Sequence, residues 1–326
     1  MIKIGQIGIG HNHSDKIDAV KKFPDLFEIV GYAEEDEAWI EKRGSNETFA
    51  DLPRISTEEV LEKSDAILVE TDVWNLTKTA QMCIDAGKHI HMDKPASGTL
   101  EEYKHLLDSA KKKNLVVQLG YMYRYNPAIN KLMDMVKSGQ LGQISAVHTE
   151  MSVRHNDAYR TWLNNFKGGD MYIFGSHLID LIISILGEPK RVISTICSSN
   201  ENDVVAPDLT AALLEYDHAI GRVFTSSVEW DGWARRCLCV DGSLGTVEIK
   251  PLEDPCLMTF APKHAGPRFG VMKAEPIPVP NVQNAYRYDI MMQKFYDYIT
   301  GAEENPYTYD HEYMLHKVIL DAIGGI

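Results

Sequence analysis

The chain has 326 residues, of which 44% are hydrophobic and 25% charged, an ordinary globular composition that excludes disordered, collagenous and disulfide-scaffold classes. This length exceeds a typical domain of about 100–200 residues and predicts two domains. The net charge of −14 argues against a nucleic-acid partner, because phosphates repel an acidic chain. No apolar run approaches the roughly 20 residues needed to span a bilayer, so no membrane association is expected. Five scattered cysteines fit reduced thiols and a cytoplasmic location.

Over the first third of the chain, β-branched runs alternate with helical patterns. Helices are expected at 75–86 and 99–113, the second opening with Thr99 and Glu102 in the spacing of a capping box. This alternation predicts an α/β domain, residues 1–121, built on a doubly wound parallel sheet of the Rossmann type. The runs expected to form its strands are 2–9, 28–33, 65–70, 88–92 and 115–120.

The remainder, residues 122–326, has a different pattern. Asn126-Pro127 predicts the start of a helix that ends near Gly139, and a second helix is expected at 174–186. Successive strands without intervening helices predict an α+β domain with a large, open, mostly antiparallel sheet. Its expected strands are 143–153, 190–199, 208–217, 220–230, 235–241 and 244–250.

The last part of the chain combines an irregular segment with two helices. Tail helices are expected at 286–300 and 311–323, and they are expected to pack back near the first domain. Clustered prolines predict an irregular segment before them, as a surface loop or a sheet edge. These prolines are Pro262, Pro267, Pro276, Pro278 and Pro280.

A glycine turn follows the first strand. Gly8 and Gly10 suit a tight strand-to-helix turn that approaches a pyrophosphate, although His13 stands where the third glycine of such motifs belongs. Glu34 ends the second strand, where an acid accepts hydrogen bonds from a ribose and repels a 2′-phosphate, so NAD is the expected cofactor. The expected cofactor contacts in and near this turn are Gly8, Gly10, His11, Asn12, His13 and Glu34, joined by Thr71 and Trp74 after the third strand.

Two His-x-His pairs raise the alternative of a metal site. His11 and His13 flank one residue of the turn, and His89 and His91 share one face of the fourth strand. Two ligands without a third nearby make a poor site, so no metal is expected.

A lysine ends the fourth strand. Lys94 lies between Asp93 and Pro95 at the edge of the sheet where open α/β folds bind ligands. An ammonium there can hydrogen-bond a substrate hydroxyl and ease its deprotonation. A cis bond before Pro95 would fix the local turn.

At this point the sequence resembles a known family. Asp93-Lys94-Pro95 is similar to the Glu-Lys-Pro signature of the glucose–fructose oxidoreductase, inositol dehydrogenase and rhizopine-catabolism (Gfo/Idh/MocA) group, and 85–89 to its Glu-Ala-Gly-Lys-His run. Two further segments are similar to motifs of this group. They are 120–127, which contains Arg124, and the pair of glycines at 139 and 142. The resemblance implies a nicotinamide-binding domain, and a second domain whose open sheet makes a homo-oligomer, dimer or tetramer. The implied chemistry is at a sugar, inositol or polyol carbon.

A largely apolar helix carries a polar stripe. His177, Asp180 and Ser184 share one face, and buried polar groups need a partner or a cleft. The segment 168–180 resembles the family's Gly-Gly-x-x-x-Asp-x-Gly-x-His-x-x-Asp run, in which the histidine is the general base. Ile173 replaces the family aspartate, and Asp170, Tyr172 and Asp180 are the candidates to compensate. The expected catalytic residues are Lys94, His177 and Asp180. Further cofactor contacts are expected from Asp93, Lys94 and Arg124. The residues expected to bind substrate are Lys94, Tyr123, Arg154, Trp162 and His177.

These observations predict an NAD-dependent dehydrogenase acting on a sugar, glycoside or cyclic polyol. Two alternatives stay open. One is an enzyme that retains NAD and uses transient oxidation for elimination, epimerisation or glycosidic cleavage. The other is a non-catalytic NAD- or sugar-sensing regulator, which the loss of the aspartate at Ile173 would favour.

Overall fold

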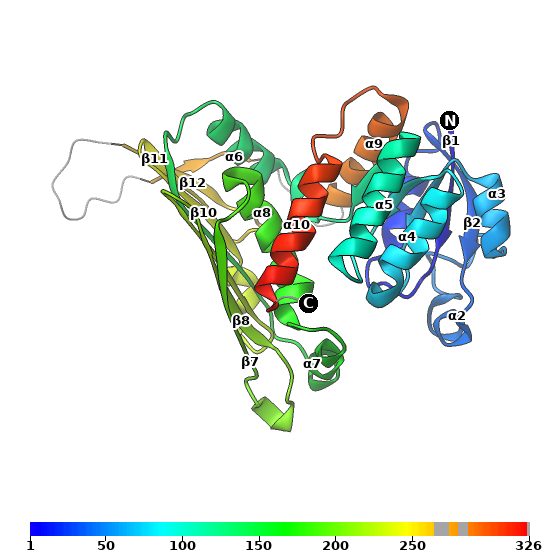
Figure 1. Ribbon diagram of the computed structural model, residues 1–326, viewed down its shortest axis with the longest axis horizontal. Coiled ribbons are helices and arrows are strands. Elements are labelled where there is room, and N and C mark those ends of the chain that lie inside the picture. The colour runs from blue at the N-terminus through cyan, green and yellow to red at the C-terminus, as the bar shows by residue number, and fades with distance from the viewer. Residues whose placement is uncertain (264–273, 280–285, 325–326) are drawn as a thin grey trace. The chain divides into compact units, whose positions relative to one another are not determined.

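The computed structural model describes residues 1–263, 274–279 and 286–324, which divide into two compact units (Figure 1). Unit 1 comprises Met1–Tyr121 with Tyr288–His316, and unit 2 comprises Met122–Arg287 with Lys317–Ile326. None of the described helices is long and apolar enough to cross a membrane.

Unit 1 contains the predicted parallel sheet. Its strands lie in the order β2-β1-β3-β4-β5, and every adjacent pair is parallel. Each residue of β3 is buried, as expected for a strand covered on both faces. The bounds are β1 (Ile2–Ile7), β2 (Phe27–Ala33), β3 (Ala66–Val69), β4 (His89–Met92) and β5 (Val117–Leu119).

Helices connect these strands and pack on the sheet. α1 (Ile17–Lys21) contacts β2, α3 (Thr57–Lys63) contacts β1 and β2, and α4 (Leu76–Asp85) contacts β3 and β4. α2 (Glu37–Arg43) follows β2, and α5 (Leu100–Lys113) packs on α4. The capping box at Thr99 and Glu102 is confirmed, since both of its hydrogen bonds are present. The strand order reverses between β1 and β3, where doubly wound sheets bind ligands.

Two segments from the end of the chain complete unit 1. In α9 (Tyr286–Thr300), the ring of Tyr296 packs edge-on against Phe27 at 5.7 Å, and the carbonyl of Met291 accepts a 3.0 Å hydrogen bond from Gln118. α10 (Tyr309–Ala322) begins with Tyr309, whose hydroxyl donates to the carbonyl of Leu115 at 2.7 Å.

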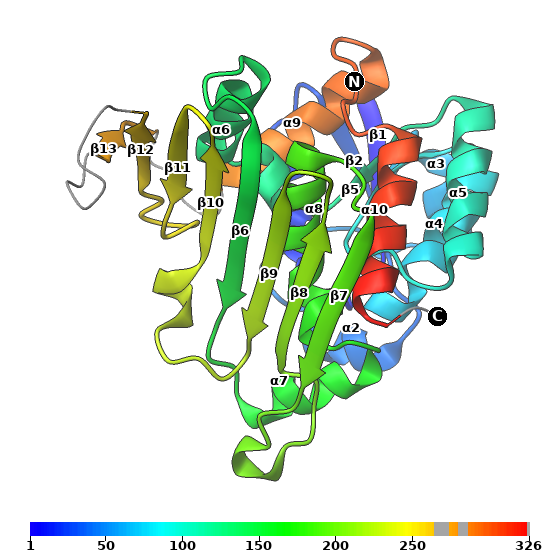
Figure 2. The ribbon, with the colours of Figure 1, turned by 60° about the vertical axis from the view of Figure 1, so that its left-hand side comes forward.

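Unit 2 is built on an eight-stranded open sheet in the order β13-β12-β11-β10-β6-β9-β8-β7. All adjacent pairs are antiparallel except β6 with β9, which confirms a mostly antiparallel sheet. α8 (Ser176–Leu186) covers one face and contacts β6 and β9 (Figure 2). The strands are β6 (Ile144–Ser152), β7 (Arg191–Cys197), β8 (Leu209–Glu215), β9 (Ile220–Ser226), β10 (Cys237–Gly242), β11 (Gly245–Ile249), β12 (Met258–Pro262) and β13 (Glu275–Ile277).

The proline-rich segment includes a sheet edge, one of its two expected forms. It is not wholly irregular, because β12 and β13 extend the sheet, with Pro262 ending one strand and Pro276 inside the other. Pro276 is tolerated because β13 is an edge strand, where a missing N–H costs no ladder bond. Pro267 and Pro280 lie outside the described residues.

Two further helices lie in unit 2. α6 (Pro127–Lys137) is capped as predicted, since the Asn126 side chain accepts from the N–H groups of Ala128 and Ile129. α7 (Asp157–Trp162) was not expected from the sequence, because only its cap, Asn156, distinguishes so short a helix.

Candidate functional site

The turn after β1 requires its glycines. Gly8 has φ +90°, and a Cβ on it would lie 2.5 Å from the backbone nitrogen of Thr71, at the end of β3. A Cβ on Gly10 would lie 2.9 Å from Nε1 of Trp39 and 3.3 Å from Cγ of Asp72. Close backbone approach at this edge is what a dinucleotide pyrophosphate requires, so the turn fits that cofactor.

Two charged side chains hold the turn. The Glu34 carboxylate, after β2, accepts hydrogen bonds of 2.9 Å from the N–H groups of Ile9 and Asp36. Arg43 of α2 donates to the carbonyls of Ile9 and His11. The expected acid therefore lies beside the glycine turn, while Arg43 was missed because nothing in its local sequence links it to residues so far away.

Residues after β3 lie on the other side of the turn. Thr71 flanks Gly8, and Trp74 is 48% exposed. Asp72, which the sequence did not single out, accepts a 3.0 Å hydrogen bond from Nε1 of Trp39. The sequence prediction thus located the loop but not the Trp39–Asp72 contact that lies over Gly10.

A buried group of polar side chains lies beneath the turn. We call Lys16, Glu70, His91 and Asp93 the Lys16 cluster. Lys16 Nζ lies 2.8 Å from Oε1 of Glu70, 2.8 Å from Oδ2 of Asp93 and 2.9 Å from Nε2 of His91. All four side chains are at most 3% exposed. The sequence signal for Glu70 is a charged residue directly after a fully apolar strand.

The cluster shifts the pKa values of its members. Burial would lower the pKa of Lys16, but Asp93 and Glu70 outweigh burial and raise it. Burial would raise the pKa of Asp93, but His11, Lys16 and His13 outweigh it and hold that pKa well below its usual range. Burial raises the pKa of Glu70 despite Lys16, and burial together with Lys16 lowers the pKa of His91 to about 3. The surroundings therefore favour the charged forms of Lys16 and Asp93 and the neutral forms of Glu70 and His91.

Lys94 is anchored to this cluster. Its peptide N–H donates to Oδ1 of Asp93 at 2.7 Å, and its side chain is largely buried, with the residue 3% exposed. The Lys94–Pro95 peptide bond is cis, as expected. Oδ2 of Asp93 lies 2.8 Å from Nδ1 of His11 and 3.1 Å from Nδ1 of His13. One carboxylate thus joins the lysine to the glycine turn.

The candidate general base lies in unit 2. His177 is the second residue of α8, which follows a π-helical turn at Met171–Gly175, and it is 2% exposed. Its ring lies 5.4 Å from that of Tyr123. The Tyr123 hydroxyl donates to Oε1 of Glu253 at 2.7 Å, and Glu253 also binds Arg236 and Arg287. Sequence reasoning missed Glu253 because its partners come from distant segments.

Asp180 and Arg124 bind one another. Nε of Arg124 lies 3.1 Å from both carboxylate oxygens of Asp180, and Nη2 lies 2.7 Å from Oδ1. Both side chains are buried. Asp180, one of the three polar residues on this face of α8, therefore has its partner, Arg124, within unit 2.

Ile173, at the position of the family aspartate, lies in the π-helical turn and is 5% exposed. Of the residues expected to compensate, Tyr172 is also buried in this turn. Asp170 is fully buried and accepts a 2.7 Å hydrogen bond from the Ser227 hydroxyl. Among the described residues its Oδ2 has no hydrogen-bond partner, and burial raises its pKa well above the usual range.

Two other predicted substrate contacts have partners in unit 2. Arg154 pairs with Glu201, donates to the carbonyl of Val228 and lies 4.4 Å from the ring centroid of Trp230. The Trp162 ring lies 4.7 Å from that of Phe166.

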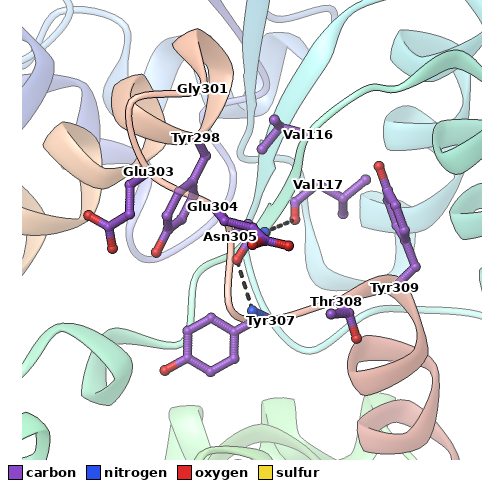
Figure 3. Close-up of a pocket in the computed structure, with 10 residues that line it drawn as sticks. All are labelled: Val116, Val117, Tyr298, Gly301, Glu303, Glu304, Asn305, Tyr307, Thr308 and Tyr309. Atoms are coloured by element: carbon purple, nitrogen blue, oxygen red, sulfur yellow. Dashed lines mark hydrogen bonds between the residues drawn. The ribbon is translucent and has the colours of Figure 1, made fainter.

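A cavity of about 430 Å³ lies elsewhere in unit 1 (Figure 3). Asn305 bridges it, donating to the carbonyl of Val117 at 3.4 Å and accepting from the N–H of Tyr307 at 3.0 Å. Val117 is the first residue of β5, so the cavity lies at the amino ends of the parallel strands, whereas the glycine turn follows the carboxyl end of β1. Its lining residues are Val116, Val117, Tyr298, Gly301, Glu303, Glu304, Asn305, Tyr307, Thr308 and Tyr309.

The doubly wound sheet, the glycine turn at its switch point and the lysine at the end of β4 define a Rossmann-fold protein of the dinucleotide-binding class. The family model for the oxidoreductase family with an NAD-binding Rossmann fold matches residues 2–121, and that for the GFO/IDH/MocA C-terminal domain matches 129–248. The chain therefore belongs to the Gfo/Idh/MocA family of oxidoreductases, whose first domain binds NAD(P).

Individual relatives are distant. The chain is 27% identical over 122 residues to scyllo-inositol 2-dehydrogenase (NADP(+)) IolW of Bacillus subtilis, covering 37% of this chain and 34% of that protein. It is 23% identical over 234 residues to glucose-6-phosphate 3-dehydrogenase of the same organism, covering 68% and 65%. The chain thus matches less than two thirds of the length of either relative. The structure of UDP-N-acetylglucosamine 3-dehydrogenase GnnA from Acidithiobacillus ferrooxidans has the same fold, with a TM-score of 0.79, 17% identity and coverage of 100% and 97%.

Proposed function

We propose that this protein is an NAD-dependent dehydrogenase that transfers hydride between nicotinamide and a hydroxyl-bearing carbon of a sugar, glycoside or cyclic polyol. The observation that carries the proposal is the position of Asp93, which binds the Lys94 peptide through Oδ1 and approaches His11 and His13 of the glycine turn through Oδ2. The lysine expected at the reacting oxygen is therefore fixed to the turn expected at the cofactor. The named activities of the two Bacillus relatives support the substrate class.

NAD is the proposed cofactor because of Glu34. Its carboxylate lies at the end of β2 beside the glycine turn, where a 2′-phosphate would be repelled. The other proposed cofactor contacts are those of the turn and of the strand ends next to it, together with Arg124 of unit 2. They are Gly8, Gly10, His11, Asn12, His13, Thr71, Trp74, Asp93, Lys94 and Arg124.

In the proposed oxidation, the bound nicotinamide accepts the hydride from the substrate carbon. Lys94 holds the substrate oxygen and stabilises its developing negative charge, and the imidazole of His177 takes the hydroxyl proton. His177 belongs to unit 2 and Lys94 to unit 1. Tyr123, Arg154 and Trp162 are proposed to contact substrate.

A second candidate follows from Ile173. An isoleucine can neither orient an imidazole nor bind a hydroxyl, so position 173 does not supply the aspartate found there in the family. A non-catalytic NAD- or sugar-sensing regulator, which needs no such group, is therefore the second candidate.

An anaerobic single-turnover experiment tests the proposal. The protein at near-stoichiometric concentration with NAD is mixed with inositols, hexoses and glycosides, and the reduced-nicotinamide absorbance is followed. We expect a rise with one substrate class, slowed about 10²–10⁴-fold in His177→Ala and unchanged in His218→Ala, which alters an exposed histidine of the same unit. If the absorbance rises with no compound while NAD still binds, the protein is not a dehydrogenase. A change in the sugar products would then identify the transient-oxidation enzyme. Unchanged sugars would identify a regulator.

A further inference from the structure

The turn after β1 and the end of β4 bring two imidazoles and one carboxylate together. One ring nitrogen of His11, one of His13 and a carboxylate oxygen of Asp93 all lie within 4.8 Å of one another. We propose that these three side chains form a binding site for a divalent transition-metal ion, with Zn²⁺ as the reference ion. The inference stands on donor geometry and does not depend on the proposed reaction.

The donor set suits such an ion. Two imidazoles and one carboxylate that leave a coordination position open are typical of Zn²⁺ and of non-haem Fe²⁺. Ligand atoms that share one ion with bonds of about 2.0–2.2 Å lie roughly 3–4 Å apart. The separations of 2.8 Å from His11 Nδ1 to Asp93 Oδ2 and 3.1 Å from His13 Nδ1 to the same oxygen are close to that range. Only a small adjustment of the rings is therefore needed.

The ligands are held by the sheet and remain accessible. Asp93 follows β4 and is fully buried, and His11, in the turn after β1, is 6% exposed. The His13 side chain is 29% exposed, so this ligand faces solvent, from which water can supply a fourth ligand. The sequence analysis did not identify Asp93 as the third ligand, because it is 80 residues from His13 along the chain.

Lys16 competes for the same carboxylate, and its position is compatible with the ion. Its ammonium lies 2.8 Å from Oδ2 of Asp93, so a bound ion shares that group. Glu70 Oε1 lies 2.8 Å from the same ammonium, so Lys16 keeps a carboxyl oxygen as a partner when the ion binds. The N–H of His13 also lies 3.2 Å from Nδ1 of His11, and this hydrogen bond is exchanged for the metal bond.

A bound ion would cross-link the glycine turn to the strand end that carries Lys94. His13 stands where a third glycine is usual, so the site occupies a position that dinucleotide motifs leave without a side chain. The ion is therefore expected to stabilise the turn, and to do so without any substrate present.

Metal titration of the full chain tests the site. Protein freed of metal is titrated with Zn²⁺ and Co²⁺, with metal analysis, the visible Co²⁺ absorption band and the melting temperature as readouts. We expect one ion per chain, a raised melting temperature and reversal by EDTA. His13→Gly is expected to bind Zn²⁺ more than about 100-fold more weakly. Asp93→Asn, in which the side chain keeps nearly the same shape but loses its charge, is expected to weaken binding likewise.

Two further variants control the result. His105→Ala removes an exposed histidine of α5 and should leave binding unchanged. Lys16→Gln removes the competing ammonium and should bind at least as tightly as the wild type. Failure of the wild type to bind either ion, or unchanged affinity in His13→Gly and Asp93→Asn, would overturn the proposal and leave the three residues as members of a closed polar network.

Discussion

Arg124 and Asp180 form a buried, two-pronged ion pair that joins the segment before α6 to α8. The adjacent residue, Tyr123, lies against the ring of His177. The pair therefore fixes the surroundings of the candidate base. Its geometry favours a positioning contribution for Asp180, which the sequence had suggested as a catalytic group.

Asp180→Ala is expected to lower the free energy of unfolding by about 3–5 kcal/mol, because it leaves the Arg124 guanidinium buried without its carboxylate. Urea unfolding measures the change. The double variant Arg124→Met, Asp180→Leu should recover much of the loss, since it leaves no buried charge. Equal losses in the single and double variants would contradict this account.

Glu253 makes stability depend on pH. Burial would raise its pKa, but Arg236 and Arg287 outweigh burial and lower it below the ordinary value of 4.5. Because the folded pKa is depressed, this stabilisation is present above pH 4.5 and is lost as the pH falls through the folded pKa. In thermal unfolding, the deficit of Glu253→Gln against the wild type should be large at pH 7 and shrink toward pH 3. A deficit that is constant with pH would show that the charge is not responsible.

Glu34 is expected to select NAD. Glu34→Gln keeps an acceptor for the Ile9 N–H but removes the charge that repels a 2′-phosphate, so NADP should gain on NAD by about tenfold or more. Dissociation constants from tryptophan fluorescence measure this preference. Glu35→Gln removes a neighbouring charge and should leave it unchanged. If Glu34→Gln has the wild-type preference, the specificity lies elsewhere.

The open face of the eight-stranded sheet is the proposed oligomer contact. Ile193 of β7 and Leu213 of β8 are directly paired across the strands, and each is 46% exposed. We expect the wild type to sediment as a homo-oligomer that associates through this face. Ile193→Lys with Leu213→Lys should then sediment as a monomer, because charge there opposes burial, while its circular dichroism stays that of the wild type. Met82→Lys, which puts a charge in place of an exposed apolar residue of α4 in unit 1, is the control outside this sheet. A double variant of unchanged mass would exclude this face.

The parallel sheet, the capping box at Thr99, the cap at Asn126 and the cis bond before Pro95 were predicted because each depends on neighbours within a few residues. The proline-rich segment was expected to be a loop or a sheet edge, but the bounds of β12 and β13 were not predicted because proline suppresses the strand signal. α7 is too short for a clear periodic pattern.

The sequence by itself determined the two kinds of sheet, the glycine turn and the resemblance to a family, since periodicity and short motifs are local properties. Only the tertiary structure decided the partners: Lys16 with Glu70 and Asp93, Arg124 with Asp180, Glu253 with Tyr123, and Asp93 with two histidines. The physical reason is that ion pairs and ligand sets form between side chains brought together by strand order. Strand order is set by packing of the whole sheet, and no short stretch of sequence records it.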